Sequence, residues 1–177
     1  MGYMDDFIIP FVGLGIGNHS FVFDINDAFF ANFEYSELKK GQVKVEVNLE
    51  RQERMLVFLF DLKGSVHVTC DRCLDEFDQS VDGHEKLIIK FGHEHLEESD
   101  EILVIPETDY QVDLAPLIYE YICVLLPIRF VHPVNEKGEY ECDPDVTRFI
   151  SEIQEHNHTD PRWNALKGLT GDNNKEE

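Results

Sequence analysis

Positively charged residues are scarce in this sequence. Lysine and arginine together number 15 in 177 residues, whereas aspartate and glutamate number 36, so the formal net charge at pH 7 is −21. Affinity for nucleic acids depends largely on cationic side chains that neutralise phosphates. The composition therefore argues against a general nucleic-acid-binding protein and favours a basic protein as a partner.

Long apolar segments are also absent. Residues 8–16 form an apolar run, but Asp5 and Asp6 precede it where a secretion signal would carry basic residues. Residues 114–131 are interrupted by charged residues and prolines, which makes them unsuitable as a membrane span. We expect no secretion signal and no transmembrane helix, and hence a cytoplasmic protein.

Cysteine is rare as well, since the sequence has only Cys70, Cys73, Cys123 and Cys142. In a reducing compartment such residues serve as metal ligands, buried thiols or redox groups more often than as disulfides. Hydrophobic residues make up 42% of the chain, so a core can form without covalent cross-links.

Alternating apolar residues predict a β-sheet. Strands are predicted for residues 8–25, 41–50, 55–70, 80–91 and 101–106. The 55–70 segment is either one strand bent at Gly64 or a hairpin, and both alternatives give antiparallel pairing. The acidic segment 92–101 has no lysine or arginine, and we expect it to be a solvated or disordered loop.

Capping signals predict three helices. A short helix follows Asn26 or Asp27. The longest helix begins after Asp113, has a proline in its first turn and ends before Pro127. A third helix is expected over residues 144–155.

These elements predict an α+β fold. It consists of a curled, partly barrel-like antiparallel sheet with the 113–126 helix packed on it, followed by a helical, acidic C-terminal tail. We expect one domain over residues 1–142 and the tail over residues 143–177.

The tail contains a further helix signal. Asp160 and Pro161 mark a helix start, and Trp163, Leu166 and Leu169 then share one face. A helix of this length is marginal by itself in water. We expect it to dock on its own domain or on a partner, with Trp163 as the anchor.

The most specific local pattern is the Cys-Asp-Arg-Cys motif at residues 70–73. Two thiolates separated by two residues can bind one tetrahedral metal ion. His132 and Cys142 could complete a zinc site with Cys70 and Cys73, although the nine residues between them exceed the usual spacing. Three possibilities stay open here: a zinc site, a metal-free buried arrangement and a redox pair.

The redox possibility is the weakest of the three. Reactive pairs of this type sit at a helix amino terminus, whereas this motif follows a predicted strand. Asp71, Asp75 and Glu76 oppose thiolate formation, and only Arg72 favours it. Cys123 lies in the apolar half of the long helix, and we expect a packed thiol there rather than a ligand.

Enzymatic signatures are missing. A zinc deaminase carries His-x-Glu before its cysteine pair, whereas His95 and Glu97 follow it here. A metal-dependent hydrolase is disfavoured because no carboxylate has a sequence spacing from the cysteines that would indicate a catalytic role. We expect the pairs His93/His95 and His156/His158 to be solvated, and we predict no catalytic residues.

Several blocks together resemble one known family. They lie at residues 13–17, 24–30, 64–74, 113–127 and 160–166, with His132 and Cys142 after the fourth block. In this order they resemble the YceD family, the large ribosomal RNA subunit accumulation proteins, over about residues 8–170. The closing Asp-Pro-Arg-Trp block is similar to the tail of Bacteroidetes-type members.

The resemblance implies a non-enzymatic role in the processing or accumulation of large-subunit ribosomal RNA. In one mechanism, the acidic surface and the terminal helix with Asp160, Arg162 and Trp163 hold a basic ribosomal protein or another assembly factor. In the other, the cysteine turn with Arg72 forms a zinc-stabilised surface that touches RNA. The net charge favours the first mechanism, in which contact with ribosomal RNA is indirect.

Overall fold

The computed structural model describes residues 3–136, 138 and 140–155. The chain divides into a first unit, Met1–Val131, and a second unit, His132–Glu177. We treat each unit by itself. None of the described helices is long and apolar enough to cross a membrane.

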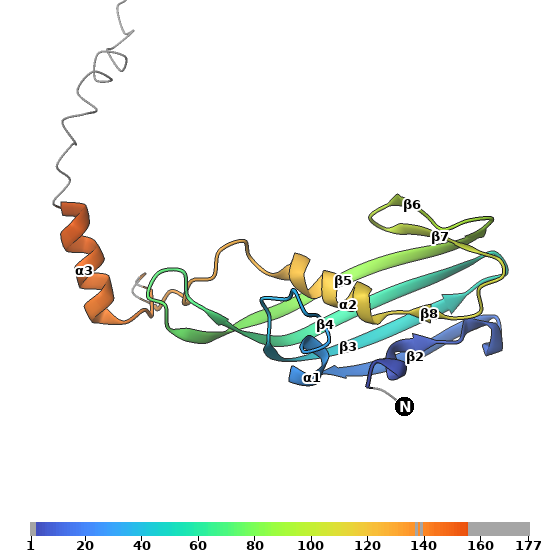
Figure 1. Cartoon of the computed structure of the whole chain (residues 1–177), viewed down its shortest axis with the longest axis horizontal. Helices are drawn as coiled ribbons and strands as arrows, with labels where there is room; N and C mark the ends of the chain where they lie inside the picture. The colour runs from blue at the N-terminus through green and yellow to red at the C-terminus, as the bar shows by residue number, and fades with distance from the viewer. Residues whose placement is uncertain (1–2, 137, 139, 156–177) are drawn as a thin grey trace, which may run out of the picture. The chain divides into compact units, whose positions relative to one another are not determined.

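A six-stranded sheet dominates the first unit (Figure 1). Its strands, in spatial order, are β2 (Gly17–Ile25), β3 (Lys40–Arg51), β4 (Met55–Thr69), β5 (Glu76–Gly92), β7 (Ile102–Pro106) and β6 (Leu96–Ser99). The order is linear, with β2 and β6 at the edges. The α+β class is confirmed, but the expected barrel-like closure is not.

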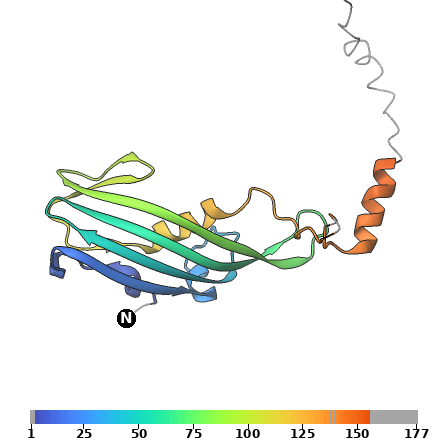
Figure 2. The same ribbon diagram turned by 180° about the vertical axis from the view of Figure 1, so that it is seen from behind.

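The centre of the sheet is the antiparallel meander β3–β4–β5. Figure 2 shows these strands running side by side, and their registers are unbroken. The 55–70 segment is one long strand rather than a hairpin. A Cβ atom on Gly64 would lie 2.0 Å from the carbonyl oxygen of Gln42 and 2.6 Å from Cα of Val43. Glycine therefore permits the close approach of β3 and β4 at this point.

Two expectations for the segment after β5 are wrong. The acidic segment 92–101 is not wholly a loop, because residues 96–99 form β6 with all four side chains exposed. The sheet is not purely antiparallel, because β7 runs parallel to β5. β6 binds β7 through its backbone, so its polar side chains stay solvated and leave no apolar alternation in the sequence.

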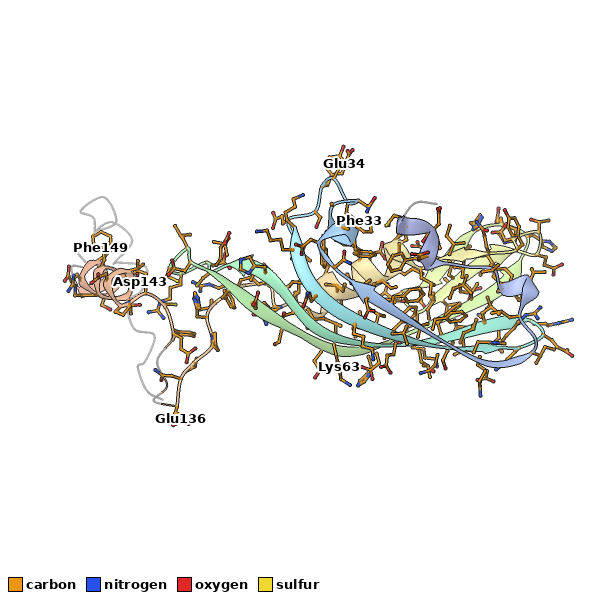
Figure 3. The ribbon with its side chains drawn as sticks, turned by 90° about the horizontal axis from the view of Figure 1, so that it is seen from below. Phe33, Glu34, Lys63, Glu136, Asp143 and Phe149 are labelled. Carbon is orange, nitrogen blue, oxygen red and sulfur yellow. The ribbon has the colours of Figure 1, made fainter. Side chains whose placement is uncertain are left out.

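Helix α2 (Ala115–Leu125) lies across one face of the sheet (Figure 1), and Figure 3 shows Lys63 on the opposite face. The Asp113 carboxylate accepts a hydrogen bond from the Ala115 N–H at 2.9 Å, which supports the predicted start. Ile118 and Ile122 of α2 are fully buried. The core lies between α2 and the alternating residues of the meander, as the apolar pattern predicts.

The N-terminal segment closes one side of this core. It contains η1 (Tyr3–Phe7), β1 (Ile8–Ile9), η2 (Phe11–Gly13) and α1 (Asp27–Phe30). β1 pairs with β8 (Val112–Asp113), just before α2. The Asn26 side chain accepts a hydrogen bond from the Ala28 N–H, so the predicted cap is confirmed. Phe33, labelled in Figure 3, stacks on Tyr119 of α2 with ring centroids 4.2 Å apart.

The second unit contains the predicted helix α3 (Pro144–Glu155). Asp143 caps it, because its carboxylate accepts hydrogen bonds from the N–H groups of Asp145 and Val146 at 2.7 and 3.3 Å. The predicted helix that starts at Asp160 lies outside the described residues. The domain boundary at residue 142 stays a prediction.

Candidate metal centre

Cys70 and Cys73 lie in the turn that joins β4 to β5. The Cys70 N–H donates a hydrogen bond to the Asp75 carbonyl at 2.8 Å, and the Leu74 N–H donates to the Cys70 carbonyl at 2.9 Å. Leu74 has a φ of 66°, a left-handed conformation that lets the chain reverse. Both cysteines are buried, at 0% and 6% exposure. The turn therefore holds two thiols inside the protein rather than on its surface.

The sulfur of Cys70 already has an N–H donor. The Arg72 N–H donates a hydrogen bond to Cys70 Sγ over 3.4 Å. Donors of this kind orient a cysteine ligand and stabilise the charge on a thiolate. The Arg72 side chain itself is half-buried. This local geometry fits a metal-ligating thiolate.

Asp71 binds the segment that follows α2. Its N–H donates to the Phe130 carbonyl at 2.7 Å, and the Phe130 N–H donates to Asp71 Oδ2 at 2.8 Å. From the sequence alone, Asp71 is a negative charge beside the thiols. The two reciprocal bonds hold Phe130 against the cysteine turn, within the first unit, and His132 follows two residues later.

Within the second unit, the chain folds back between His132 and Cys142. Val134 and Tyr140 form a β-bridge, and the Glu141 N–H donates to the Pro133 carbonyl at 3.0 Å. The return brings His132 Nδ1 to 3.8 Å from Cys142 Sγ. The backbone pairing of residues 133–134 with 140–141 makes this return a small hairpin, which explains how a pair with unusual spacing meets.

These local arrangements bring the four predicted ligands close together. Cys70, Cys73, His132 and Cys142 form a group that could hold a metal ion, and three of the four are buried. The ligand atoms of the four residues all lie within 4.8 Å of one another. Metal binding itself stays a prediction.

The ligand types determine which metal the group suits. Three thiolates and one imidazole are soft and borderline ligands, of the kind found in structural Cys3His zinc sites. Four protein ligands complete a tetrahedral shell, so a metal held by all four has no position for water or substrate. The motif also lies between two antiparallel strands, not at a helix amino terminus, which argues further against a redox pair.

Among the described residues, the other cysteine and histidine residues considered above are not part of this group. Cys123 is exposed on α2, so the expected packed thiol is wrong. His93 and His95 are exposed, as expected. Outside the described residues lie His156, His158, Asp160, Arg162 and Trp163.

A cavity of about 390 Å³ opens beside the cysteine turn. Its lining includes the cations Lys39 and Lys40, but also the carboxylates Glu37, Asp71 and Glu76. The wall of the cavity therefore carries both positive and negative charges. Such a lining is not the cationic surface that repeated phosphate contacts require.

The fold and this site define a class: small α+β proteins in which a long antiparallel meander carries a buried Cys-x-x-Cys turn. A family model described as "Large ribosomal RNA subunit accumulation protein YceD" matches residues 59–170. The match covers more than half of the chain, so the chain belongs to the YceD family. The matched range includes all four candidate ligands, and the first two resembling blocks lie before it. No curated protein and no solved structure matches the chain.

Proposed function

We propose that this protein is a non-enzymatic ribosome biogenesis factor that supports the processing or accumulation of large-subunit ribosomal RNA. The observation that carries the proposal is the family match over residues 59–170. The ligand set at the cysteine turn supports a structural role, because four protein ligands leave a metal no open position for catalysis. This work would take place in the cytoplasm, where subunits assemble.

The direct partner would be a basic ribosomal protein or another assembly factor. A net charge of −21 attracts a cationic protein, speeds their encounter and favours release at high salt. Contact with ribosomal RNA would then be indirect. The proposed partner-binding residues are Arg72, in the cysteine turn, and Asp160, Arg162 and Trp163.

Depletion and rescue in cells test the function. The measurement is the ratio of mature large-subunit to small-subunit ribosomal RNA, with rescue by wild type, by Cys70→Ser/Cys73→Ser or by Cys123→Ser. We expect the ratio to fall on depletion and to recover with wild type and with the exposed-cysteine control, but not with the double variant. An unchanged ratio after depletion would contradict the proposed function.

We propose zinc as the ion at Cys70, Cys73, His132 and Cys142. The zinc would stabilise the cysteine turn and tie the hairpin before α3 to it, so that residues 1–142 fold as one domain and residues 143–177 form the tail. The chemistry of the donors and the N–H donor to Cys70 Sγ support this assignment.

Cobalt titration tests the zinc site directly. Full-length reduced protein should bind one equivalent of Co²⁺ with the absorption of a tetrahedral thiolate complex, and Zn²⁺ should displace it. Cys142→Ser should abolish this spectrum, whereas Cys123→Ser should leave it unchanged. Equal spectra for wild type and Cys142→Ser would contradict the ligand set, and exchange of an inner-sphere water would favour a hydrolase instead.

Direct RNA contact through the cysteine turn is the second candidate. Arg72 lies in this turn, and its guanidinium could reach a phosphate or stack on a base. Because the adjacent cavity carries charges of both signs, we rank direct RNA contact below protein binding. Arg72→Ala and Cys70→Ser should both reduce RNA association if this candidate is correct, and unchanged association would eliminate it.

A further inference from the structure

Helix α3 has an apolar face that the sequence analysis left without a role. Val146, Phe149, Ile150 and Ile153 follow the spacing of one helix face. The side chains of Phe149 and Ile153 are 62% and 56% exposed, and those of Val146 and Ile150 are half-buried. Figure 3 shows Phe149 projecting from the helix. Two large apolar side chains on one exposed helical stripe are typical of a binding surface.

Acidic side chains border this apolar face. Arg148 is the only cation of α3, and it lies 3.4 Å from the Asp145 carboxylate and 3.9 Å from that of Glu152. Asp143 adds a further negative charge at the helix start. Acids therefore outnumber bases along the helix, and the helix as a whole is negatively charged.

Local interactions also favour the helical conformation of α3 before a partner covers its apolar face. The capping bonds from Asp143 and the Arg148 pairs each favour the helical conformation. A helix of 12 residues is nevertheless marginal in water without burial of its apolar face. An occupant that covers Phe149 and Ile153 would supply the missing stabilisation.

We propose that the face made by Val146, Phe149, Ile150 and Ile153 is the docking surface for a basic, amphipathic segment of a large-subunit ribosomal protein. This inference rests on the proposed function and names the surface that performs it. Charge complementarity selects the occupant, because cations on the partner would meet the acids beside the stripe. A second copy of the chain would instead bring another net charge of −21 against them.

Binding of full-length protein to large-subunit ribosomal proteins, extracted from purified subunits and freed of RNA, tests the inference. Phe149→Asp/Ile153→Asp should lower the affinity at low salt at least about tenfold. The matched control is Leu59→Asp, since Leu59 is 50% exposed on β4 in the first unit. The control should bind like wild type. Phe149→Ser, with circular dichroism of each variant, separates loss of the surface from loss of the helix.

The possible outcomes of this experiment separate a failure of the proposed docking surface from a failure of the proposed function. If wild type binds no ribosomal protein at low salt, both the docking surface and the proposed partner class are overturned. If wild type and Phe149→Asp/Ile153→Asp bind equally, only the docking surface is overturned. The docking surface is likewise overturned if the variant converts a wild-type dimer to a monomer.

Discussion

The side-chain hydroxyl of Tyr121, in the helix α2 that packs on the sheet, has an unusual environment. Its hydroxyl is buried and has no hydrogen-bond partner among the described residues, while its ring contacts the edge of Phe60 at a centroid distance of 5.0 Å. Burial raises the pKa of Tyr121 to about 12, with smaller contributions from Glu85, Glu120 and Glu101. A buried hydroxyl without a partner loses its hydrogen bonds to water on folding.

We therefore expect Tyr121→Phe to keep or increase stability, by up to about 1 kcal/mol, because the ring packing remains and the unpaired hydroxyl is removed. Urea unfolding measures the difference in the free energy of unfolding. In an alkaline absorbance titration, the variant should lack the tyrosine that ionises near pH 12. A loss of more than about 1 kcal/mol would show that the hydroxyl has a stabilising partner.

His67 lies between two carboxylates near the cysteine turn. Its Nδ1 is 3.0 Å from Asp78 Oδ1 and its Nε2 is 3.0 Å from Glu76 Oε2. The hydrogen bond to Asp78, followed by that to Glu76, raises the pKa of His67 above 6.5. When the ring is protonated, its two ion pairs link β4 to the start of β5.

The pH dependence of this link follows from the direction of the shift. Because the pKa is higher in the folded state, the stabilising contribution is complete below the unfolded pKa and is lost as pH rises through the folded pKa. Histidine NMR titration should give a pKa above 6.5 for His67, and Glu76→Gln/Asp78→Asn should lower it. Glu94→Gln removes a distant charge and should leave it unchanged; an equal fall in both variants would contradict this account.

At the scale of elements, the close contact between β3 and β4 at Gly64 gives a sharp prediction. Gly64→Ala should destabilise the protein by at least about 2 kcal/mol, because the new methyl group would overlap backbone atoms of β3. Gly15→Ala is the matched control, since a Cβ there meets no atom within 4 Å, and its effect should stay within about 0.5 kcal/mol. Thermal unfolding measures both, and equal effects would contradict the clash.

Periodicity predicted those elements whose side chains are buried in a repeating pattern. The meander strands were found in this way because an apolar face repeats along each of them, whereas the cap and proline signals predicted α2. β6 has no buried side chain, and the direction of β7 depends on where the chain crosses over, so neither leaves a periodic signal. Cys123 shows the complementary limit, since an apolar segment does not reveal which side of a helix is covered.

At the scale of the whole molecule, the charge balance makes a prediction about stability. Repulsion within a chain of net charge −21 disfavours the compact state, and salt screens this repulsion. We expect the melting temperature to rise as the sodium chloride concentration increases from low to moderate. Each kcal/mol of folding free energy that the screening restores should raise the melting temperature by about 2–4 °C. Differential scanning calorimetry at several salt concentrations checks this, and a flat or falling profile would contradict it.

The candidate metal centre was predictable as a set of residue types but not as a geometry. Two cysteines at a two-residue spacing define half of a site, and His132 with Cys142 was the available complement. The bonds between Asp71 and Phe130 join residues that are far apart in sequence, and no local pattern announces them. The structure was needed to show these bonds.

The pairing of β1 with β8 has a consequence for the order in which the molecule folds. β3, β4 and β5 are consecutive and pair through short connections, whereas β1 pairs with a strand at the opposite end of the first unit's sequence. Closing the long loop between β1 and β8 costs more conformational entropy than pairing strands that are adjacent in sequence. We therefore expect the meander to form early and β1 to pair late. During synthesis, β1 leaves the ribosome well before β8 and would therefore wait for its partner strand until most of the first unit has been made.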